Sequence, residues 1–331
     1  MRDIMSAGIQ SAKALCLATL VLGGTGCDKP GQETPEESKS QSDITTINEV
    51  KQSAETPMAD SGNAEAIPSQ KPQSEPATTP MFTSVAEIHE YIKKSNPSYT
   101  QGGQFEVTQD GQVIAAALPA CQISNIAFLK EWPLIQVDLS NNPISDLSPI
   151  RGKKSLKSLY LENTEIRDIS ALYGLPLVEL YLSNTPVVDI MPLAEMPLEN
   201  LNLLGTGVYD LLPLARSPIR MLWLSETPVT DVTPLIACPI ESLTLHRTPV
   251  SDISPLAGTG IQRLHIGETD VTDISPVLGM RLNRLIFTPS RIETGLDQVR
   301  QLPFLREVGT SFETRMAPAQ FWDLFDQGQL P

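Results

Sequence analysis

The chain has 331 residues, with 28 prolines, four cysteines and a formal net charge of −15 at pH 7. Only 5% of the residues are aromatic. The acidic balance argues against a nucleic-acid-binding protein, which needs a basic stripe. The length allows one long domain or two short ones.

Residues 1–27 have the features of an export signal. Arg2 and Lys13 flank a weak basic region, and an apolar run over 14–22 is too short to span a bilayer. The segment ends in Gly24-Thr-Gly-Cys27, which resembles the signal of bacterial lipoproteins. That resemblance implies lipidation of Cys27 and a membrane-anchored protein of the cell envelope. The alternative is an ordinary signal cut near here, which predicts a secreted or periplasmic protein.

Residues 28–80 form a polar tract that we predict to be a disordered tether. They contain seven prolines, ten acidic residues and four lysines, and no Phe, Trp or Tyr. Such a composition cannot bury enough apolar surface to offset the entropy of ordering. A coil of this length would span on the order of 40 Å.

Residues 81–115 are predicted to form an N-terminal cap. Ser84 and Glu87 match a capping box at the start of an apolar helical pattern. Asp110-Gly111 then reads as the turn of a hairpin within 105–114. Repeat arrays need such caps, because an open end exposes the core.

Residues 116–287 repeat the pattern L-x-L-x-x-T-x-V-x-D-x-x-P-L with a period of 21 residues and one step of 22. The period indicates a solenoid, and each L-x-L predicts a short strand with one buried face. Four apolar columns run down the repeats, and stacking buries them mutually. The first column is Ala116, Val137, Leu159, Leu180, Leu201, Leu222, Leu243 and Leu264.

Two polar columns are equally regular, and we interpret both as structural. Seven aspartates stand three residues before a Pro, or before Ala171 in one case, where a carboxylate can cap backbone N–H groups. A threonine column occupies the place of Asn142 in an earlier repeat, where it can bond the turn backbone. The first set is Asp146, Asp168, Asp189, Asp210, Asp231, Asp252 and Asp273, and the second is Thr164, Thr185, Thr206, Thr227, Thr248 and Thr269.

This pattern resembles the short leucine-rich repeats of bacterial internalin-like proteins. The resemblance implies an α/β repeat solenoid: a curved, right-handed horseshoe with a parallel β-sheet on the concave face and short 3₁₀ or helical turns on the convex face. The chain departs from the family by having Thr in place of most ladder asparagines. In the first copy, Cys121 and Asn125 replace the usual Thr and Asp.

Residues 288–331 are predicted to form a helical C-terminal cap. The segment 293–302 has a helical pattern, and Pro318 starts a second amphipathic helix in which Phe321 and Trp322 are expected in the core. The run resembles the cap of planctomycete-type repeat proteins, some of which are fused to kinases. Neither a glycine-rich nucleotide loop nor a His-Arg-Asp triplet occurs in the sequence.

The sequence contains none of the common hydrolase, metalloprotease or P-loop motifs, so we predict a non-enzymatic protein without a cofactor. Cys121 and Cys238 lie about five repeats apart, too far to form a disulfide. His246 and His265 belong to adjacent repeats, and with Glu268 they could hold a metal. We prefer solvated surface histidines and predict no metal site.

The candidate binding surface is the concave face. Side chains between and beside the two leucines point outward there, and Tyr, Trp and Met in such positions are typical of interfaces. The alternative is that strands favour these residue types whatever their function. The candidate residues are Tyr160, Tyr181, Leu204, Met221, Trp223, His246, Arg263 and His265.

These observations favour an exported repeat protein that binds a protein partner through its concave face. The partner is not identified, and neither nucleic acid nor a small-molecule substrate is expected. The alternative is a cell-envelope carbohydrate-binding module, because Tyr and Trp also stack on sugar rings. A third, less favoured hypothesis is an enzyme with an unrecognised site around His246 and His265.

Overall fold

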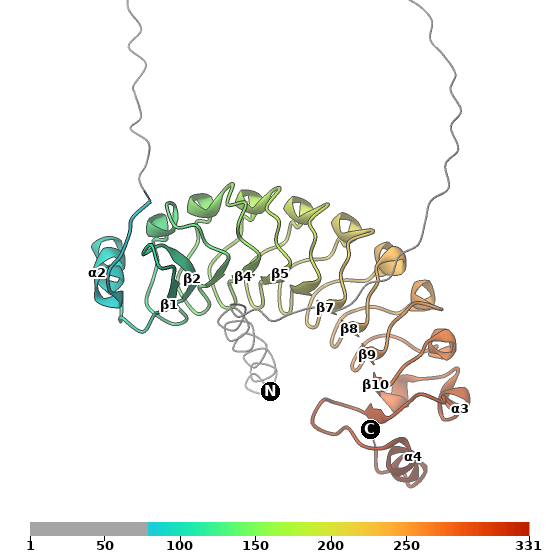
Figure 1. The fold of residues 1–331 in the computed structure, drawn as a ribbon. Helices are drawn as coiled ribbons and strands as arrows, with labels where there is room; N and C mark the ends of the chain where they lie inside the picture. The colour runs from blue at the N-terminus through green and yellow to red at the C-terminus, as the bar shows by residue number, and fades with distance from the viewer. Residues whose placement is uncertain (1–78, 331) are drawn as a thin grey trace, which may run out of the picture. The chain divides into compact units, whose positions relative to one another are not determined.

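The structure, a computed structural model, describes residues 79–330. They belong to the second of two compact units, Lys71–Pro331. Within this unit the chain coils into an open arc, with strands along its inner side and short helical turns along its outer side (Figure 1). The predicted export signal, Cys27 and the tether over 28–80 lie outside the described residues, apart from the last two positions of the tether.

An 11-stranded sheet forms the inner side, and its strands follow one another in chain order. β1 pairs with β2 in an antiparallel hairpin, whereas β2 to β11 are parallel. Each leucine pairs with the leucine of the next repeat, as Leu159 does with Leu180. The strands are β1 Gln104–Val107, β2 Val113–Ala117, β3 Gln136–Asp138, β4 Ser158–Tyr160, β5 Glu179–Tyr181, β6 Asn200–Asn202, β7 Met221–Trp223, β8 Ser242–Thr244, β9 Arg263–His265, β10 Arg284–Ile286 and β11 Glu307–Gly309.

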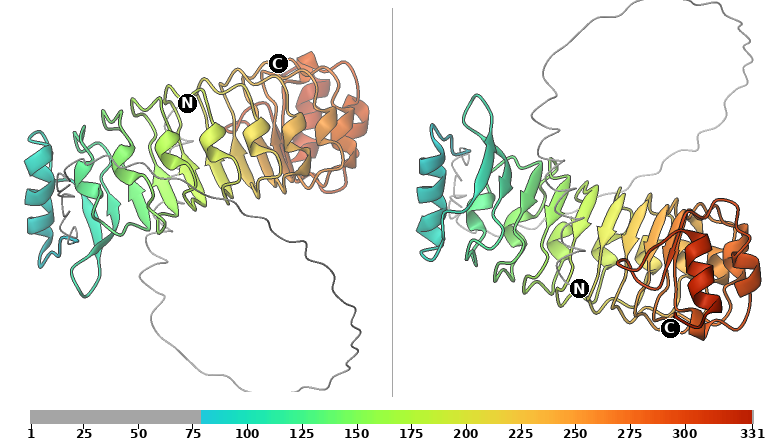
Figure 2. Two further views of the ribbon diagram at one scale, coloured as in Figure 1. Left: turned by 90° about the horizontal axis from the view of Figure 1, so that it is seen from above. Right: turned by 90° about the horizontal axis from the view of Figure 1, so that it is seen from below.

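Short 3₁₀ segments form the outer side and lie in a row when the arc is seen from above (Figure 2). In each of seven repeats, the carboxylate of the column aspartate accepts a hydrogen bond from the backbone N–H two residues later, as between Asp146 and Ser148 at 2.7 Å. The predicted hydrogen bonding to the turn backbone is therefore confirmed, although each aspartate stands one residue before the N-cap, which is Leu147 in the case of Asp146. The segments are η1 Ala127–Leu129, η2 Ser148–Ile150, η3 Ser170–Leu172, η4 Met191–Leu193, η5 Leu212–Leu214, η6 Thr233–Ala237, η7 Ser254–Leu256, η8 Ser275–Gly279 and η9 Pro289–Arg291.

The threonine column ties each turn internally. Every hydroxyl donates to the carbonyl three residues earlier, at 2.6 to 2.8 Å. Asn142 does more, because its amide joins two repeats: its oxygen accepts from the N–H groups of Cys121 and Ile123, and its nitrogen donates to three carbonyls including that of Leu118. The structural interpretation of this column is confirmed.

The N-terminal cap contains the predicted helix and hairpin. Helix α2 spans Val85–Ser95, and the Ser84 hydroxyl accepts a hydrogen bond from the N–H of Glu87. The Glu87 carboxylate in turn accepts hydrogen bonds from the backbone N–H and the hydroxyl of Thr83. Gly111 adopts a φ of +80° at the hairpin turn, a conformation that glycine tolerates. Strand β2 is both the second hairpin strand and the first strand of the parallel sheet.

The C-terminal cap departs from the prediction in two respects. Strand β11 adds a further parallel strand inside 288–331. The helix predicted over 293–302 is shorter: α3 covers only Leu296–Val299. Thr294 bridges Asp273 of the preceding turn, and Gly295 follows with a φ of +92°, so the chain continues the solenoid until that glycine.

The final helix, α4 Pro318–Asp326, begins at the predicted proline and closes the end of the core. Phe321 is fully buried and Trp322 nearly so, which confirms their expected place in the cap. Cys121 and Cys238 are likewise buried, and both are free thiols. Among residues 79–330, no helix is long and apolar enough to cross a membrane.

Candidate functional site

A row of aromatic rings lies on the inner side of the sheet over β4 to β7. The ring centroids of Tyr160 and Tyr181 are 5.0 Å apart, and those of Tyr181 and Trp223 are 5.9 Å apart. Tyr181 and Trp223 are separated by β6, and strands two positions apart lie roughly 9.5 Å from each other. The two rings therefore lean together across β6. We call Tyr160, Tyr181 and Trp223 the aromatic row.

Asn202 of β6 explains how the two rings can meet. Its short side chain lies between the columns of Tyr181 and Trp223 and is fully buried. The amide oxygen accepts a hydrogen bond from the N–H of Leu204 at 3.0 Å, while the amide nitrogen has no partner among the described residues. A longer residue here would separate the rings.

The members of the aromatic row differ in exposure. Tyr160 and Tyr181 are only 2% and 3% exposed, whereas Trp223 is partly exposed, as are its neighbours Met221 and Leu204. The Tyr160 hydroxyl donates to the carboxylate of Glu179 at 2.7 Å. The accessible apolar centre of the inner face is therefore at β6 and β7, and the two buried tyrosines lie beside it on β4 and β5.

The two histidines form a second cluster, nearer the C-terminal end. The rings of His246 and His265 stack with centroids 4.8 Å apart, and Phe312 of the C-terminal cap contacts His265 edge-on at 4.7 Å. His265 is 3% exposed and His246 8% exposed. The expectation of solvated surface histidines is therefore wrong, because the loop around Phe312 covers the inner face at this point.

Burial has a large effect on His265. Loss of solvation, with a smaller contribution from the neighbouring His246, lowers the pKa of His265 from 6.5 to about 3. Both ring nitrogens of His265 lack a hydrogen-bond partner among the described residues. His246 differs, since its Nδ1 donates to the carbonyl of Gly267 at 3.0 Å. His265 is thus a neutral imidazole that packs against the rings of His246 and Phe312.

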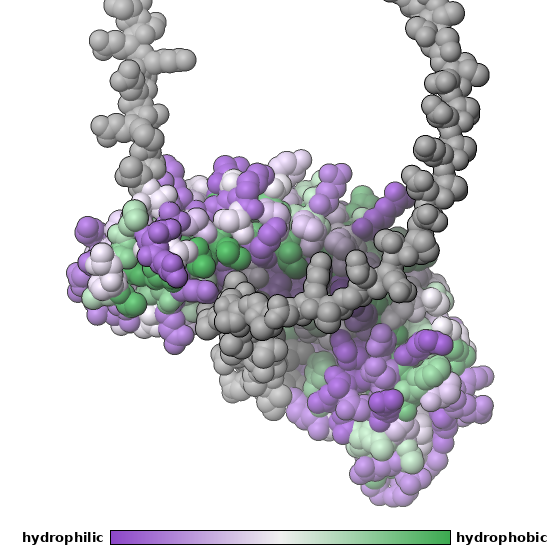
Figure 3. Space-filling view, viewed as in Figure 1, coloured by the Kyte–Doolittle hydropathy of each residue, from purple (hydrophilic) through white to green (hydrophobic). Residues whose placement is uncertain are grey.

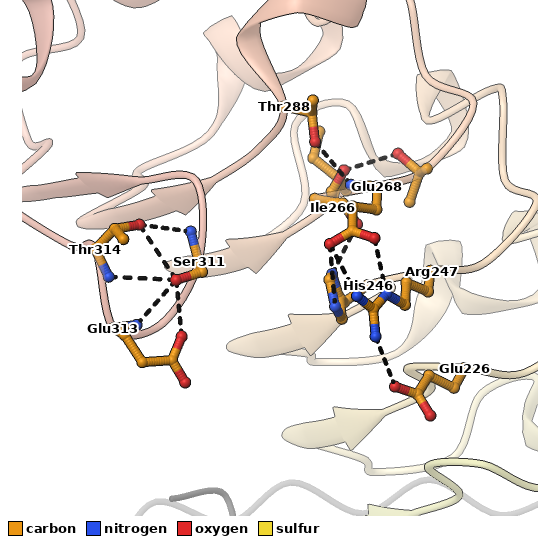
Figure 4. A network of polar contacts seen from close by, with 11 residues as sticks. Glu226, His246, Arg247, Ile266, Glu268, Thr288, Ser311, Glu313 and Thr314 are labelled. Atoms are coloured by element: carbon orange, nitrogen blue, oxygen red, sulfur yellow. Dashed lines mark hydrogen bonds and ion pairs between the residues drawn. The ribbon is translucent and has the colours of Figure 1, made fainter. Parts of the chain in front are cut away.

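An ion-pair ladder adjoins His246 (Figure 4). The Arg247 guanidinium lies between Glu226, at 3.4 Å, and Glu268, at 2.8 Å. Hydrogen bonding with Arg247 lowers the pKa of Glu268 and raises that of Arg247. His246 Nε2 is 3.9 Å from the Glu268 carboxylate. Within residues 79–330, no group of three or more His, Cys, Asp or Glu side chains is arranged to hold a metal ion.

These charges belong to a further column of the repeat, which was not predicted from the sequence. Each member of this column stands two residues after the second leucine of its repeat, as Glu226 does after Leu224. All members have a positive φ. In the early repeats Asn163 bonds to Asn141, and Asn184 bonds to Asn163, each at 2.9 Å. The column continues as Gly205, Glu226, Arg247 and Glu268. The available signal was the adjacent pair Asn163-Thr164, which recurs as Asn184-Thr185.

Arg263 is the remaining candidate of the predicted binding surface. Arg263 stands at the start of β9 and is partly exposed, on the same strand as His265. The structure thus brings Tyr160, Tyr181 and Trp223 together with Met221 and Leu204, and it brings His246 to His265. The two groups lie on different strands of the inner face, with Thr244 of β8 between them.

Comparison with known proteins identifies the repeat type. A family model described as Leucine Rich repeats (2 copies) matches residues 134–174. An internalin (inlF) from Listeria monocytogenes is 24% identical with a TM-score of 0.50, covering 67% of this chain and 74% of its own. Internalin C2 (inlC2) from the same species is 21% identical with a TM-score of 0.49, covering 61% and 92%. No curated protein matches the sequence.

These findings confirm the fold class. The described residues have the fold of a leucine-rich repeat solenoid, with an open, mostly parallel sheet and short 3₁₀ turns. At 24% identity the likeness to the internalin concerns the fold and does not extend to a ligand.

Proposed function

We propose that this leucine-rich repeat protein is a non-enzymatic binding protein, and that it recognises a protein partner through the inner face at β6 and β7. The observation that carries this proposal is the aromatic row with its partly exposed end. Trp223, Met221 and Leu204 form an apolar patch on a rigid sheet, and aromatic residues and Met are enriched at interface centres.

The supporting residues make this patch preorganised. Tyr181 lies against Trp223 from one side, and Tyr160 supports Tyr181 in turn. The hydroxyl of Tyr160 is held by Glu179, whose other oxygen accepts from Asn200 at 3.0 Å. A side chain that is already fixed loses little entropy when it is covered, so more of its burial contributes to affinity.

The same geometry disfavours the carbohydrate alternative. Stacking on a sugar ring requires an open aromatic face, and the faces of Tyr160 and Tyr181 are buried. The hydroxyl of Tyr160 is already bonded to a carboxylate. Trp223 alone remains available, and one partly exposed indole beside Met221 suits the apolar centre of a protein interface better than a sugar platform.

The test is affinity capture from cell-envelope extract with the purified protein, its Trp223→Ala variant and a Tyr209→Ala control. Tyr209 is 62% exposed and stands outside the strands, so the control removes an exposed aromatic from elsewhere. We expect one protein to be retained by the native chain and the control, and its affinity for Trp223→Ala to fall at least about 30-fold, as at an interface hot spot. Equal retention by all three proteins contradicts the proposal.

We propose further that the chain is exported and lipid-anchored through Cys27. The support is the sequence of residues 1–27 and the polar tract after them. Labelling cells with an alkyne fatty acid should mark the native protein and leave Cys27→Ala unmarked. An unlabelled native protein whose mature N-terminus lies near residue 27 would instead establish an ordinary signal peptide.

A further inference from the structure

A groove runs along one flank of the last three turns, away from the inner face. It forms where the chain returns from η7, η8 and α3 to the strands β9, β10 and β11, and its volume is about 1040 Å³. Its lining includes Gly258, Gly260 and Gly279, the side chains of Arg281 and Arg306, and Phe304. Nothing in the concave-face proposal uses these residues.

Sequence changes within one repeat column create the groove. Five earlier turns carry a proline three residues before the strand begins, the last being Pro239. The next turns carry Gly260, Arg281 and Phe304 in that place. Gly260 leaves a gap between larger neighbours, and a Cβ at Gly258 would meet nothing within 4 Å. Backbone therefore lines the groove at Gly258 and Gly260, and Arg281 and Phe304 form a wall.

The charge of the groove is opposite to that of the protein. Its lining contains three arginines and one glutamate, whereas the sequence beyond residue 80 has an excess of ten negative charges. Arg284 is paired with Glu307. Neither Arg281 nor Arg306 has a carboxylate partner among the described residues, and both are exposed.

Arg281 is held in place without losing its hydrogen-bonding capacity. Its guanidinium lies 5.3 Å from the centre of the Phe304 ring, in a cation–π contact. Such stacking uses the face of the guanidinium and leaves its N–H fork free to bind a carboxylate with two hydrogen bonds. Phe304 itself is 51% exposed, so the wall also offers an apolar surface.

We propose that this groove binds an extended acidic peptide segment of a protein partner. Carboxylates of the segment pair with Arg281 and Arg306, and an apolar side chain of the segment packs on Phe304. The amides of Gln262 and Asn283 line the floor between them and supply donors and acceptors for a peptide backbone. A nucleic acid fits less well, because two unpaired guanidiniums cannot offset the repulsion between a polyanion and the acidic unit.

The probe is a fluorescein-labelled octaglutamate with one central leucine, and the control peptide has glutamine for every glutamate. Binding to the purified protein is followed by fluorescence anisotropy at 50 and 300 mM NaCl. The test variant is Arg281→Gln/Arg306→Gln. The matched control is Arg167→Gln/Arg216→Gln, which removes the same charge from two other exposed arginines.

We expect the groove variant to bind the acidic peptide about tenfold more weakly than the native chain, and the matched control to bind within twofold. High salt should weaken native binding, and the glutamine peptide should not bind. Phe304→Ser should weaken the leucine-containing peptide and leave an all-glutamate peptide unchanged. Equal losses in both double variants, or competition by inorganic polyphosphate at lower concentration than the peptide, would overturn the proposal.

Discussion

Replacing His265 by leucine should remove most of the acid sensitivity that the C-terminal end of the solenoid confers on the protein. The pKa of His265 is about 3 in the folded chain because of burial and the neighbouring His246, against 6.5 for a free imidazole. Between these values the unfolded chain binds a proton that the folded chain does not. Stability is therefore highest above pH 6.5 and falls as the pH decreases toward 3.

The size of the effect follows from that difference in pKa. Lowering the pH from 8 to 5 should reduce the free energy of unfolding by about 2 kcal/mol through His265 alone, and the limit below pH 3 is roughly 5 kcal/mol. The aspartates that cap the outer turns act in another range. Backbone hydrogen bonding lowers the pKa of Asp146, so its contribution is present above pH 4 and disappears only below it.

The assay is urea unfolding at pH 8 and pH 5, followed by tryptophan fluorescence. The His265→Leu variant should lose about 2 kcal/mol less than the native chain over this interval. His89→Gln serves as the control, because His89 lies on α2 and bonds to Tyr99, far along the chain from this cluster. If native and His265→Leu proteins lose equal stability between the two pH values, the buried neutral imidazole is not the cause.

Two further pairs of substitutions test which hydrogen bonds stabilise the repeats. Asn142→Ala should reduce the free energy of unfolding by about 3 kcal/mol, because it leaves the N–H groups of Cys121 and Ile123 buried without an acceptor. Thr206→Val loses one hydrogen bond within a single turn and should cost about 1 kcal/mol in the same urea titration. Asp146→Ala should lower the thermal midpoint through a loss of about 1 kcal/mol at the cap, and Asp146→Asn should restore most of it, since an amide oxygen can accept the same bond from Ser148. Equal effects of Asn142→Ala and Thr206→Val, or of the two Asp146 variants, would contradict these assignments.

The repeats could be predicted because the residue type in each column specifies a local backbone geometry. A buried pair such as Leu159 and Leu161 specifies a strand, and Asp168 two residues before the Ser170 N–H specifies the turn that follows. A period of 21 residues then places every copy beside the next, so in-register pairing needs no further information. The location of the aromatic row on the inner face follows from the same periodicity.

Two features of the site could not be predicted, because they depend on contacts outside the period. Phe312 reaches His265 from a loop of the C-terminal cap, and nothing in the spacing of the two residues indicates that contact. The convergence of Tyr181 and Trp223 depends on the size of Asn202, which lies between them and was not weighed as a spacer. Periodicity assigns a side chain to a face of the sheet, but exposure on that face depends on its neighbours.

The column with positive φ shows why the accessible apolar patch lies where it does. Asn184 ends the asparagine ladder, and a Cβ at the next member, Gly205, would lie 2.6 Å from the Asn184 side-chain oxygen. The ion-pair ladder starts only one repeat later, at Glu226. Gly205 therefore interrupts this column between the asparagine ladder and the ion-pair ladder. The partly exposed Leu204 precedes Gly205 directly, and Trp223 stands on the next strand, so the proposed contact surface lies beside this interruption.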